Sequence, residues 1–274
     1  MQLRLKKFDL NSVADNSILV LLGKRNTGKS FLVRDILWHH QDMPVATVIS
    51  PTEAANRFYS KLVPSLFIHD KVTPELLAGV VKRQRMIKKR VNREIAMHGS
   101  TNIDGRAAVI LDDCLYDRSW AQDENVRYLF MNGRHVNAFV MITMQHPMGI
   151  PPNLRTNIDY TFIFRENNQS NRRRIYENYA GMFPTFDVFC QVMDQATNGY
   201  DCLVIANAAR SNKLEEQVFW YCADGHDEFR IGAPEFWQAH KDICDESDDD
   251  DEELLDMSKM RSRKGPNINV RMFP

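Results

Sequence analysis

The sequence has few cysteines and no long apolar run, and these absences narrow the class of protein. Five cysteines are scattered over 274 residues without a Cys-x-x-Cys pair. This argues against a disulfide framework and a structural zinc site and favours reduced thiols in a cytosolic compartment. The eight histidines show no convincing metal-binding spacing either. No apolar run approaches the roughly 18 residues of a membrane helix, and the amino terminus lacks the apolar stretch of a secretory signal.

Net charge is also nearly absent, because 35 Lys and Arg stand against 36 Asp and Glu, a formal charge of −1. The distribution is uneven. Residues 242–256 carry ten acidic residues and no Lys or Arg, so the rest of the chain has 35 basic against 26 acidic residues. A body with about nine surplus positive charges and an acidic tail is compatible with a nucleic-acid partner, which the whole-chain charge would argue against.

Length and composition favour one large globular domain. Hydrophobic residues make up 43% and charged residues 26% of the chain, which is usual for a soluble globular protein with a sizeable core. Beyond about Lys241 the composition changes to acidic residues and Ser, then to Arg and Lys with Gly and Pro. That change is typical of a disordered tail. We therefore expect a domain at residues 1–241 and a flexible acidic, then basic, tail at 242–274.

Strand-like and helical segments alternate along the domain. Short apolar or β-branched runs indicate strands, and apolar residues at helical spacing indicate helices. This alternation predicts an α/β fold with a mainly parallel sheet flanked by helices on both faces. The expected strands are 18–22, 45–50, 66–69, 107–111, 138–144, 160–164, 202–206 and 218–222, and the expected helices are 31–40, 74–98, 124–131, 170–180 and 186–194.

A phosphate-binding loop follows the first expected strand. The segment Gly23-Lys24-Arg25-Asn26-Thr27-Gly28-Lys29-Ser30 matches the pattern G-x-x-x-x-G-K-[ST] in full. The glycines let successive backbone N–H groups point at phosphate oxygens, and the following helix adds the positive end of its dipole. In this pattern Lys29 reaches the β- and γ-phosphates and the Ser30 hydroxyl binds Mg²⁺. We include Phe31 among the nucleotide-binding residues.

Two carboxylates, Asp112 and Asp113, end the apolar run that starts at Ala107. An acidic residue at the carboxyl end of a buried strand lies beside the phosphate loop and can hold Mg²⁺ through water. We assign Asp112 to the metal and Asp113 to orienting the attacking water.

Gln145 directly follows the expected strand at 138–144. Its amide is a candidate to contact the γ-phosphate and report hydrolysis, although a Gln that simply ends a strand before Pro147 fits equally well. Together, the three motifs predict Mg²⁺-dependent hydrolysis of a nucleoside triphosphate, with ATP as the expected nucleotide.

The segment from Gly133-Arg134-His135 to Gln145-His146-Pro147 resembles the glycine-arginine to glutamine-proline segment of FtsK/HerA-type DNA-pumping ATPases. The stretches at 149–160 and 178–184, and the Leu-Asp-Asp-Cys end of the acidic strand, are similar to the DNA-packaging ATPases of nucleocytoplasmic large DNA viruses, the group that includes the poxvirus packaging ATPase. The resemblance covers about residues 15–210 and implies a P-loop NTPase fold of the RecA/FtsK type.

The resemblance also implies partners and a location. It implies a homo-oligomeric ring, hexameric in the simplest case, that threads double-stranded DNA into a capsid and contacts capsid vertex components. The location it implies is the host cytoplasm at the site of virus assembly, with association to the virion.

In such rings a neighbouring subunit supplies an arginine to the active site. Arg134 matches the Gly-Arg position and is the first candidate, with Arg155 second. Where FtsK-type motors usually carry Glu, this chain has the shorter Asp113.

Two basic clusters are candidate contacts for DNA phosphates. The first has seven basic residues within twelve positions, which on a helix cover much of its circumference and repel one another unless an anion is near. The Arg172–Arg174 run is the second, and a subunit interface or the nucleotide site are its alternatives. We further expect the acidic run at 245–253 to mask a basic surface. The residues of the first cluster are Lys82, Arg83, Arg85, Lys88, Lys89, Arg90 and Arg93.

Two other functions share the phosphate loop. A nucleotide or nucleoside kinase would need an acceptor pocket with a base and a set of lid arginines, and the sequence shows no such signature. An assembly scaffold would bind the nucleotide only to switch shape. Duplex-stimulated phosphate release separates these two functions from a DNA translocase.

Overall fold

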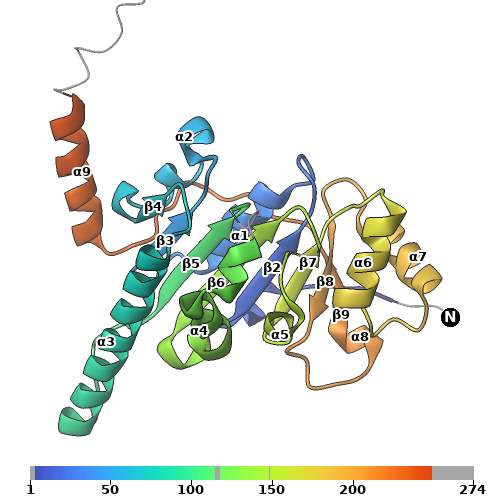
Figure 1. The fold of residues 1–274 in the computed structure, drawn as a ribbon, viewed down its shortest axis with the longest axis horizontal. Helices are drawn as coiled ribbons and strands as arrows, with labels where there is room; N and C mark the ends of the chain where they lie inside the picture. Colours follow the sequence, from blue (N-terminus) through green and yellow to red (C-terminus); the bar gives the residue numbers. More distant parts are fainter. Residues whose placement is uncertain (1–3, 115–117, 148, 249–274) are drawn as a thin grey trace, which may run out of the picture.

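The computed structural model describes residues 4–114, 118–147 and 149–248, and its centre is one nine-stranded sheet (Figure 1). The strand order is β1-β9-β8-β7-β2-β6-β5-β3-β4. All neighbouring pairs are parallel except β7–β8 and β8–β9. This confirms the predicted mainly parallel sheet. The strands are β1 Lys6–Lys7, β2 Ile18–Leu22, β3 Ala46–Ile49, β4 Ile68–His69, β5 Ala107–Asp112, β6 Ala138–Met144, β7 Tyr160–Ile163, β8 Cys202–Ala206 and β9 Val218–Tyr221.

The central strand β2 is buried on both faces, so its whole sequence is apolar. Ile18, Val20 and Leu22 point into one core, together with apolar side chains of α3, α4, α5, α6 and α7. Leu19 and Leu21 point into a second core on the other face, where α1 packs. Side chains alternate along a strand, and this alternation gives the protein three layers. The helices are α1 Lys29–His39, α2 Glu53–Asn56, α3 Pro74–His98, α4 Glu124–Asn132, α5 Pro152–Arg155, α6 Gln169–Tyr179, α7 Phe186–Ala196, α8 Leu214–Gln217 and α9 Pro234–Asp248.

The five expected helices and eight expected strands are all present, with ends shifted by a few residues. Helix α9 runs to Asp248 and so passes the tail boundary expected at residue 242. The rest of the acidic run and the basic segment after it lie outside the described residues. No helix within residues 4–114, 118–147 and 149–248 is long and apolar enough to cross a membrane.

Helix α3 is anchored at one end and projects from the body at the other (Figure 1). Thr73 caps its first turn by accepting a hydrogen bond from the N–H of Leu76. Its buried residues are Leu77, Val80, Val81 and Gln84, all within the first eleven positions. Further along the helix, Ile87 and Val91 are only partly buried and Ile95 is 45% exposed. The last two turns of the helix therefore present most of their surface to solvent.

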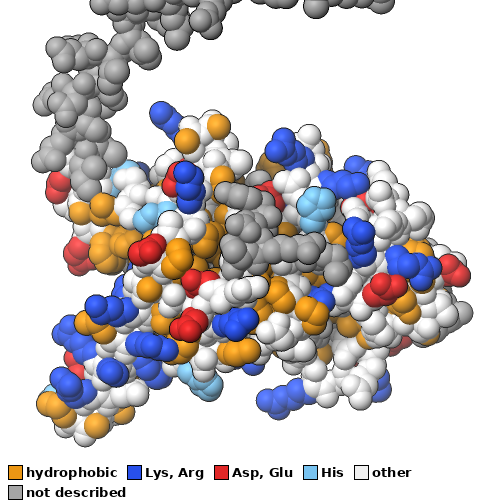
Figure 2. Space-filling model, viewed as in Figure 1, with side chains coloured by type: hydrophobic (Ala, Val, Ile, Leu, Met, Phe, Trp, Pro, Cys, Tyr) orange, Lys and Arg blue, Asp and Glu red, His pale blue; other side chains and the backbone are white. Residues whose placement is uncertain are grey.

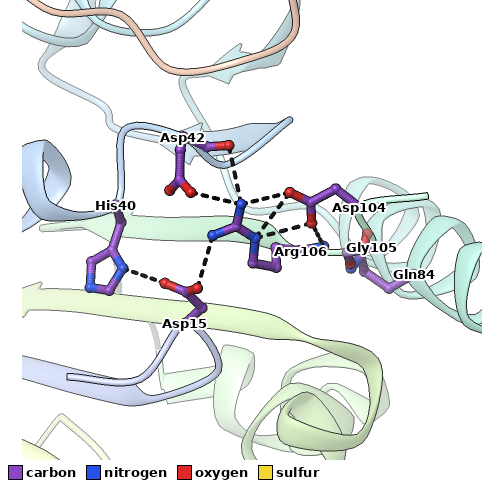
Figure 3. A network of polar contacts seen from close by, with 7 residues as sticks. All are labelled: Asp15, His40, Asp42, Gln84, Asp104, Gly105 and Arg106. Atoms are coloured by element: carbon purple, nitrogen blue, oxygen red, sulfur yellow. Dashed lines mark hydrogen bonds and ion pairs between the residues drawn. The ribbon is translucent and has the colours of Figure 1, made fainter. Parts of the chain in front are cut away.

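Polar networks hold the base of α3 and the amino ends of the strands together (Figure 3). The buried Gln84 amide donates hydrogen bonds to the carbonyls of Gly105 at 2.9 Å and Val136 at 3.0 Å. Next to it, Arg106 forms ion pairs with three carboxylates, those of Asp15, Asp42 and Asp104. These contacts connect the loops that precede β2, β3 and β5, so they fix the amino ends of these strands, which lie opposite the phosphate loop.

Candidate nucleotide site

The phosphate loop joins the carboxyl end of β2 to the start of α1. Two residues with positive φ, Asn26 at 61° and Gly28 at 99°, let the backbone curl there. A side chain at Gly23 would also clash, since an added Cβ would lie 2.8 Å from Phe164 Cβ. The loop is thus closed tightly against the strand end, which is the conformation that the phosphate-binding pattern predicts.

A cavity of about 420 Å³ opens over this loop. Phe31, which is 72% exposed, and Tyr200, which is 67% exposed, both border it. The predicted loop residues thus lie around one concave site, with Thr27 buried beneath them as its hydroxyl donates to the carbonyl of Lys24 at 2.8 Å. The cavity is lined by Lys24, Arg25, Asn26, Gly28, Lys29, Ser30, Phe31, Asp113 and Tyr200.

Lys29 points back into the loop. Its ammonium group donates to the carbonyl of Gly23 at 2.7 Å and lies 3.3 Å from Oδ2 of Asp113. Burial lowers the pKa of Lys29, while the carboxylates of Asp113 and Asp112 oppose that shift. A buried cation flanked by carboxylates is held ready to contact an anionic ligand.

The two predicted carboxylates face different partners. Oδ1 of Asp112 accepts a hydrogen bond from the Thr143 hydroxyl at 2.6 Å, and Oδ2 accepts one from the Ser50 hydroxyl at 3.1 Å. Burial raises the pKa of Asp112, and the charge of neighbouring Asp113 adds to that shift. Asp112 is therefore the inner, rigidly held carboxylate.

Asp113 turns toward the cavity instead, with a φ of 47° that is rare for a residue other than glycine. Its Oδ2 accepts a hydrogen bond from the Gln145 amide at 3.0 Å and lies beside Lys29. The strand ends of β2, β5 and β6 thus bring Lys29, Asp113 and Gln145 into one row. The structure places all three predicted residues together at the carboxyl edge of the sheet.

Sequence reasoning missed several residues that complete this site. Thr143 and Ser50 hold Asp112 through their hydroxyls. Tyr59 is buried beside the same carboxylate, and burial, together with the charge of Asp112, raises the pKa of the Tyr59 hydroxyl. Glu166, which follows β7, pairs with Lys24 at 2.6 Å. Thr in a strand and Ser at a strand end are common without any functional role. The available signal for Thr143 was that it is the polar residue in an otherwise apolar strand.

The oxygen donors present suit Mg²⁺. The ion prefers carboxylate, hydroxyl and water oxygens, and the site offers the exposed hydroxyl of Ser30 and the carboxylate of Asp112. The carboxylate of Asp112 accepts hydrogen bonds from the hydroxyls of Thr143, Ser50 and Tyr59, and of its roughly four lone-pair sites one stays available. These residues therefore fit the group that the phosphate-loop pattern implies.

Proteins of large DNA viruses are similar in sequence to this chain over most of its length. An uncharacterized protein of Acanthamoeba polyphaga mimivirus is 38% identical over 240 residues, which are 86% of this chain and 83% of the relative. An uncharacterized protein of Invertebrate iridescent virus 6 is 36% identical over 250 residues, covering 86% and 93%. No protein-family model matches the chain.

The chain belongs to this family of P-loop ATPases from nucleocytoplasmic large DNA viruses. The resemblance seen in the sequence is thereby confirmed at the level of the family.

Solved structures agree with the family in fold. The genome packaging NTPase of Sulfolobus turreted icosahedral virus 2, in complex with sulfate, superposes with a TM-score of 0.53 at 14% identity and covers 78% of this chain and 100% of that one. ATPases 2 and 3 of EssC from Geobacillus thermodenitrificans give a TM-score of 0.51 at 14% identity, covering 88% and 45%. At this identity the likeness shows the P-loop ATPase fold.

In this family member, Arg134 lies far from its own phosphate loop. It sits just before β6, at the amino edge of the sheet, and forms an ion pair with Asp159. The other oxygen of Asp159 accepts the N–H of Ile18, the first residue of β2. The five residues of β2 separate the amino end of that strand from the phosphate loop, a distance of about 16 Å. The second candidate, Arg155, lies over the ring of Tyr179 at 5.6 Å.

The predicted basic cluster lies on α3, and Figure 2 shows Lys and Arg side chains gathered along its projecting part. Three members make specific contacts: Arg85 stacks on Tyr128 at 4.0 Å, Arg90 pairs with Glu94 at 3.7 Å, and Arg83 donates to the Gln84 side chain at 3.4 Å. Arg83 differs from the rest because burial lowers its pKa. We call the other six residues the basic stem, and they are Lys82, Arg85, Lys88, Lys89, Arg90 and Arg93.

The second basic cluster, Arg172–Arg174, is not a uniform charged surface. Arg172 is only 8% exposed, donates to the carbonyl of Glu166 and pairs with Asp194 at 2.6 Å. It therefore ties α6 to α7 and to the loop after β7. Arg173 lies over Phe186 at 4.3 Å. The expectation of a DNA contact was wrong for Arg172, because its guanidinium is committed inside the protein.

Proposed function

We propose that this protein is an ATP-driven translocase of double-stranded DNA that packages the viral genome into the capsid. The single observation that carries the proposal is the row of Lys29, Asp113 and Gln145 across the ends of three neighbouring strands. It joins the phosphate loop to an acidic strand end and to a polar amide, which are the parts that nucleoside triphosphate hydrolysis requires.

Each side chain has a defined task in this proposal. Lys29 and the loop N–H groups hold the phosphates, and Ser30 and Asp112 hold Mg²⁺, which would neutralise charge developing on the phosphate oxygens. Asp113 orients the attacking water. Gln145 donates to Asp113, so a change at the γ-phosphate that moves Asp113 is passed to the end of β6.

The basic stem and the name of a structural neighbour favour a DNA motor over other uses of ATP. The stem offers six basic residues on a projecting helix, which suits contacts to phosphates of any sequence that must also release quickly. A structural neighbour is named a genome packaging NTPase and was solved with AMP and with AMPPCP. A duplex held by these contacts, and capsid vertex components, are the partners that we propose, at the site of virus assembly in the host cytoplasm.

We propose further that the active unit is a ring, with six subunits as the first expectation, and that Arg134 acts on the nucleotide of a neighbour. The distance of Arg134 from its own phosphate loop supports this, because within one subunit the two lie at opposite ends of the central strands. Mixing Arg134→Ala subunits with Lys29→Ala subunits restores ATP hydrolysis if the two roles lie on different protomers. The absence of recovery would contradict the assignment of Arg134.

Phosphate release with and without duplex DNA, and with small nucleosides, tests the proposal against its two alternatives. Hydrolysis that duplex DNA stimulates and that Lys29→Ala abolishes supports the motor. Phosphorylation of a nucleoside without DNA supports a kinase. Stoichiometric nucleotide binding without turnover supports an assembly scaffold.

A further inference from the structure

A cluster of one carboxylate and two histidines lies on the helix that follows the phosphate loop, outside the nucleotide cavity. Asp35 and His39 are one turn apart on α1, and His226 comes from the connection between β9 and α9. One oxygen or nitrogen of each side chain lies within 4.8 Å of the other two. The two histidine side chains are 15% and 12% exposed, and that of Asp35 is fully buried.

The hydrogen bonds around His39 leave its Nε2 facing the carboxylate. Nδ1 lies 3.1 Å from Oδ1 of Asn11, and the Asn11 amide nitrogen donates to Asp9 at 3.0 Å, which fixes the orientation of that amide. Nδ1 therefore carries the proton, and in the neutral ring Nε2 presents a lone pair. That lone pair lies 3.6 Å from Oδ1 of Asp35. Two electron-rich atoms so placed are stabilised by a cation between them.

The remaining contacts hold the other two side chains in place. Oδ2 of Asp35 accepts hydrogen bonds from the Tyr221 hydroxyl at 2.7 Å and from the N–H of Asp224 at 2.9 Å, which leaves Oδ1 facing the histidines. The ring of His226 stacks on Trp38, with centroids 4.2 Å apart. Outer contacts of this kind, which orient each ligand, are characteristic of metal sites in proteins.

We propose that Asp35, His39 and His226 bind a divalent transition-metal ion, with zinc as the best match to two imidazole nitrogens and one carboxylate. Ligand atoms around tetrahedral zinc lie about 3.3 Å apart, given bonds of about 2.0–2.1 Å. The His39 to Asp35 separation is already close to that value. His226 Nε2 lies 2.6 Å from Oδ1 of Asp35, so binding replaces this hydrogen bond and opens the pair by less than about 1 Å.

The site would fasten the segment after β9 to the phosphate-loop helix. Arg34, on the same helix, already donates to the carbonyls of His226 and Asp227 at 3.1 Å each. The sequence alone argued against metal binding because His39 and His226 lie far apart along the chain and only the fold brings them together.

Zinc titration of the full chain tests the proposal. The protein is stripped with EDTA, desalted and titrated with zinc chloride by calorimetry, with millimolar Mg²⁺ present to occupy sites built from oxygen donors. We expect one zinc ion per chain and a zinc-dependent rise in the melting temperature. His39→Gln and His226→Gln each weaken zinc binding by about 100-fold or more, and His98→Gln, an exposed histidine at the end of α3, leaves it unchanged.

Asn11→Ala keeps the test independent of folding defects in the ligand variants. Asn11 is exposed and touches the proposed site only through His39, so its loss weakens zinc affinity by about 10- to 100-fold while the zinc-free melting temperature stays unchanged. The proposal is overturned if no saturable binding at one zinc per chain is found, or if His39→Gln and His226→Gln bind zinc as the unsubstituted chain does.

Discussion

The hydroxyl of Thr143 donates a hydrogen bond to Oδ1 of Asp112 at 2.6 Å. The two residues lie opposite each other in the parallel pairing of β5 and β6. The same hydroxyl also accepts the N–H of Asp113 at 3.1 Å. One fully buried side chain of the neighbouring strand therefore holds the carboxylate of Asp112 and the backbone of Asp113.

Thr143→Val removes that hydroxyl with little change in side-chain volume. We expect kcat for ATP hydrolysis to fall by about tenfold or more, because the Asp112 carboxylate and the Asp113 backbone lose the group that holds them. The KM for ATP changes much less, since the phosphate loop is untouched. Steady-state phosphate-release kinetics measure both constants.

Thr161→Val is the matched control on β7. The Thr161 hydroxyl is buried and has no hydrogen-bond partner among the residues that the structure describes, so its removal is expected to be neutral or stabilising. An equal loss of kcat in the two variants would show that Thr143 acts only through general packing.

Asp113→Asn tests the role of the outer carboxylate. We expect kcat to fall by about 100-fold or more, because the charged oxygen that orients water is lost. Nucleotide affinity should stay the same or increase, since a negative charge near the phosphates is removed. Rapid-quench turnover and binding of a fluorescent nucleotide separate these effects, with the exposed Asp70→Asn as control. An Asp113→Asn enzyme with normal turnover would exclude this role.

Local patterns predicted the elements and the nucleotide loop, because those signals lie within a few consecutive residues. The strand 138–144 and the helix 74–98 are examples. Contacts between distant segments were not predictable. Arg172 was a candidate DNA contact in the sequence, because its ion pair with Asp194 of α7 forms only in the folded chain. Glu166 gave no signal, since its partner Lys24 lies more than a hundred residues earlier.

Charge removal on the basic stem tests its proposed contact with DNA. Substituting Lys88, Lys89, Arg90 and Arg93 with Gln should weaken duplex binding regardless of sequence. The slope of log affinity against log salt should also become shallower by up to about 3–4 units. Binding titrations at several salt concentrations measure both quantities.

A variant with the same charge change elsewhere provides the control. Arg4, Lys6, Arg210 and Lys213 are exposed and cluster toward the sheet edge formed by β1, β9 and β8, away from β4. Their replacement by Gln should leave the salt slope nearly unchanged. If both quadruple variants lose affinity equally, the stem has no special part in binding.

Arg106→Gln should make stability depend on pH in a defined direction. Burial tends to raise the pKa of Asp15 and Asp104, but the contacts with Arg106, joined at Asp15 by those with His40, outweigh it and hold both pKa values below their usual level. A lowered pKa in the folded state adds stability above the unfolded pKa of about 3.9, and this stability is lost as pH falls through the folded value. The variant should lose about 1–2 kcal/mol at pH 7 and progressively less below about pH 4.

Urea unfolding at a series of pH values measures this difference. Arg90→Gln is the comparison, because Arg90 is an exposed arginine whose pair with Glu94 should contribute less than about 0.5 kcal/mol. A constant difference between Arg106→Gln and the unsubstituted chain from pH 7 to pH 3 would contradict the electrostatic explanation.

The central claim is that ATP hydrolysis at the phosphate loop is coupled to double-stranded DNA, and the most direct test is the rate of phosphate release with and without duplex DNA. We predict that duplex DNA stimulates the full chain, that the stimulation falls as salt rises, and that Lys29→Ala abolishes hydrolysis. A rate that is the same with and without duplex at low salt, or hydrolysis that survives in Lys29→Ala, would contradict it.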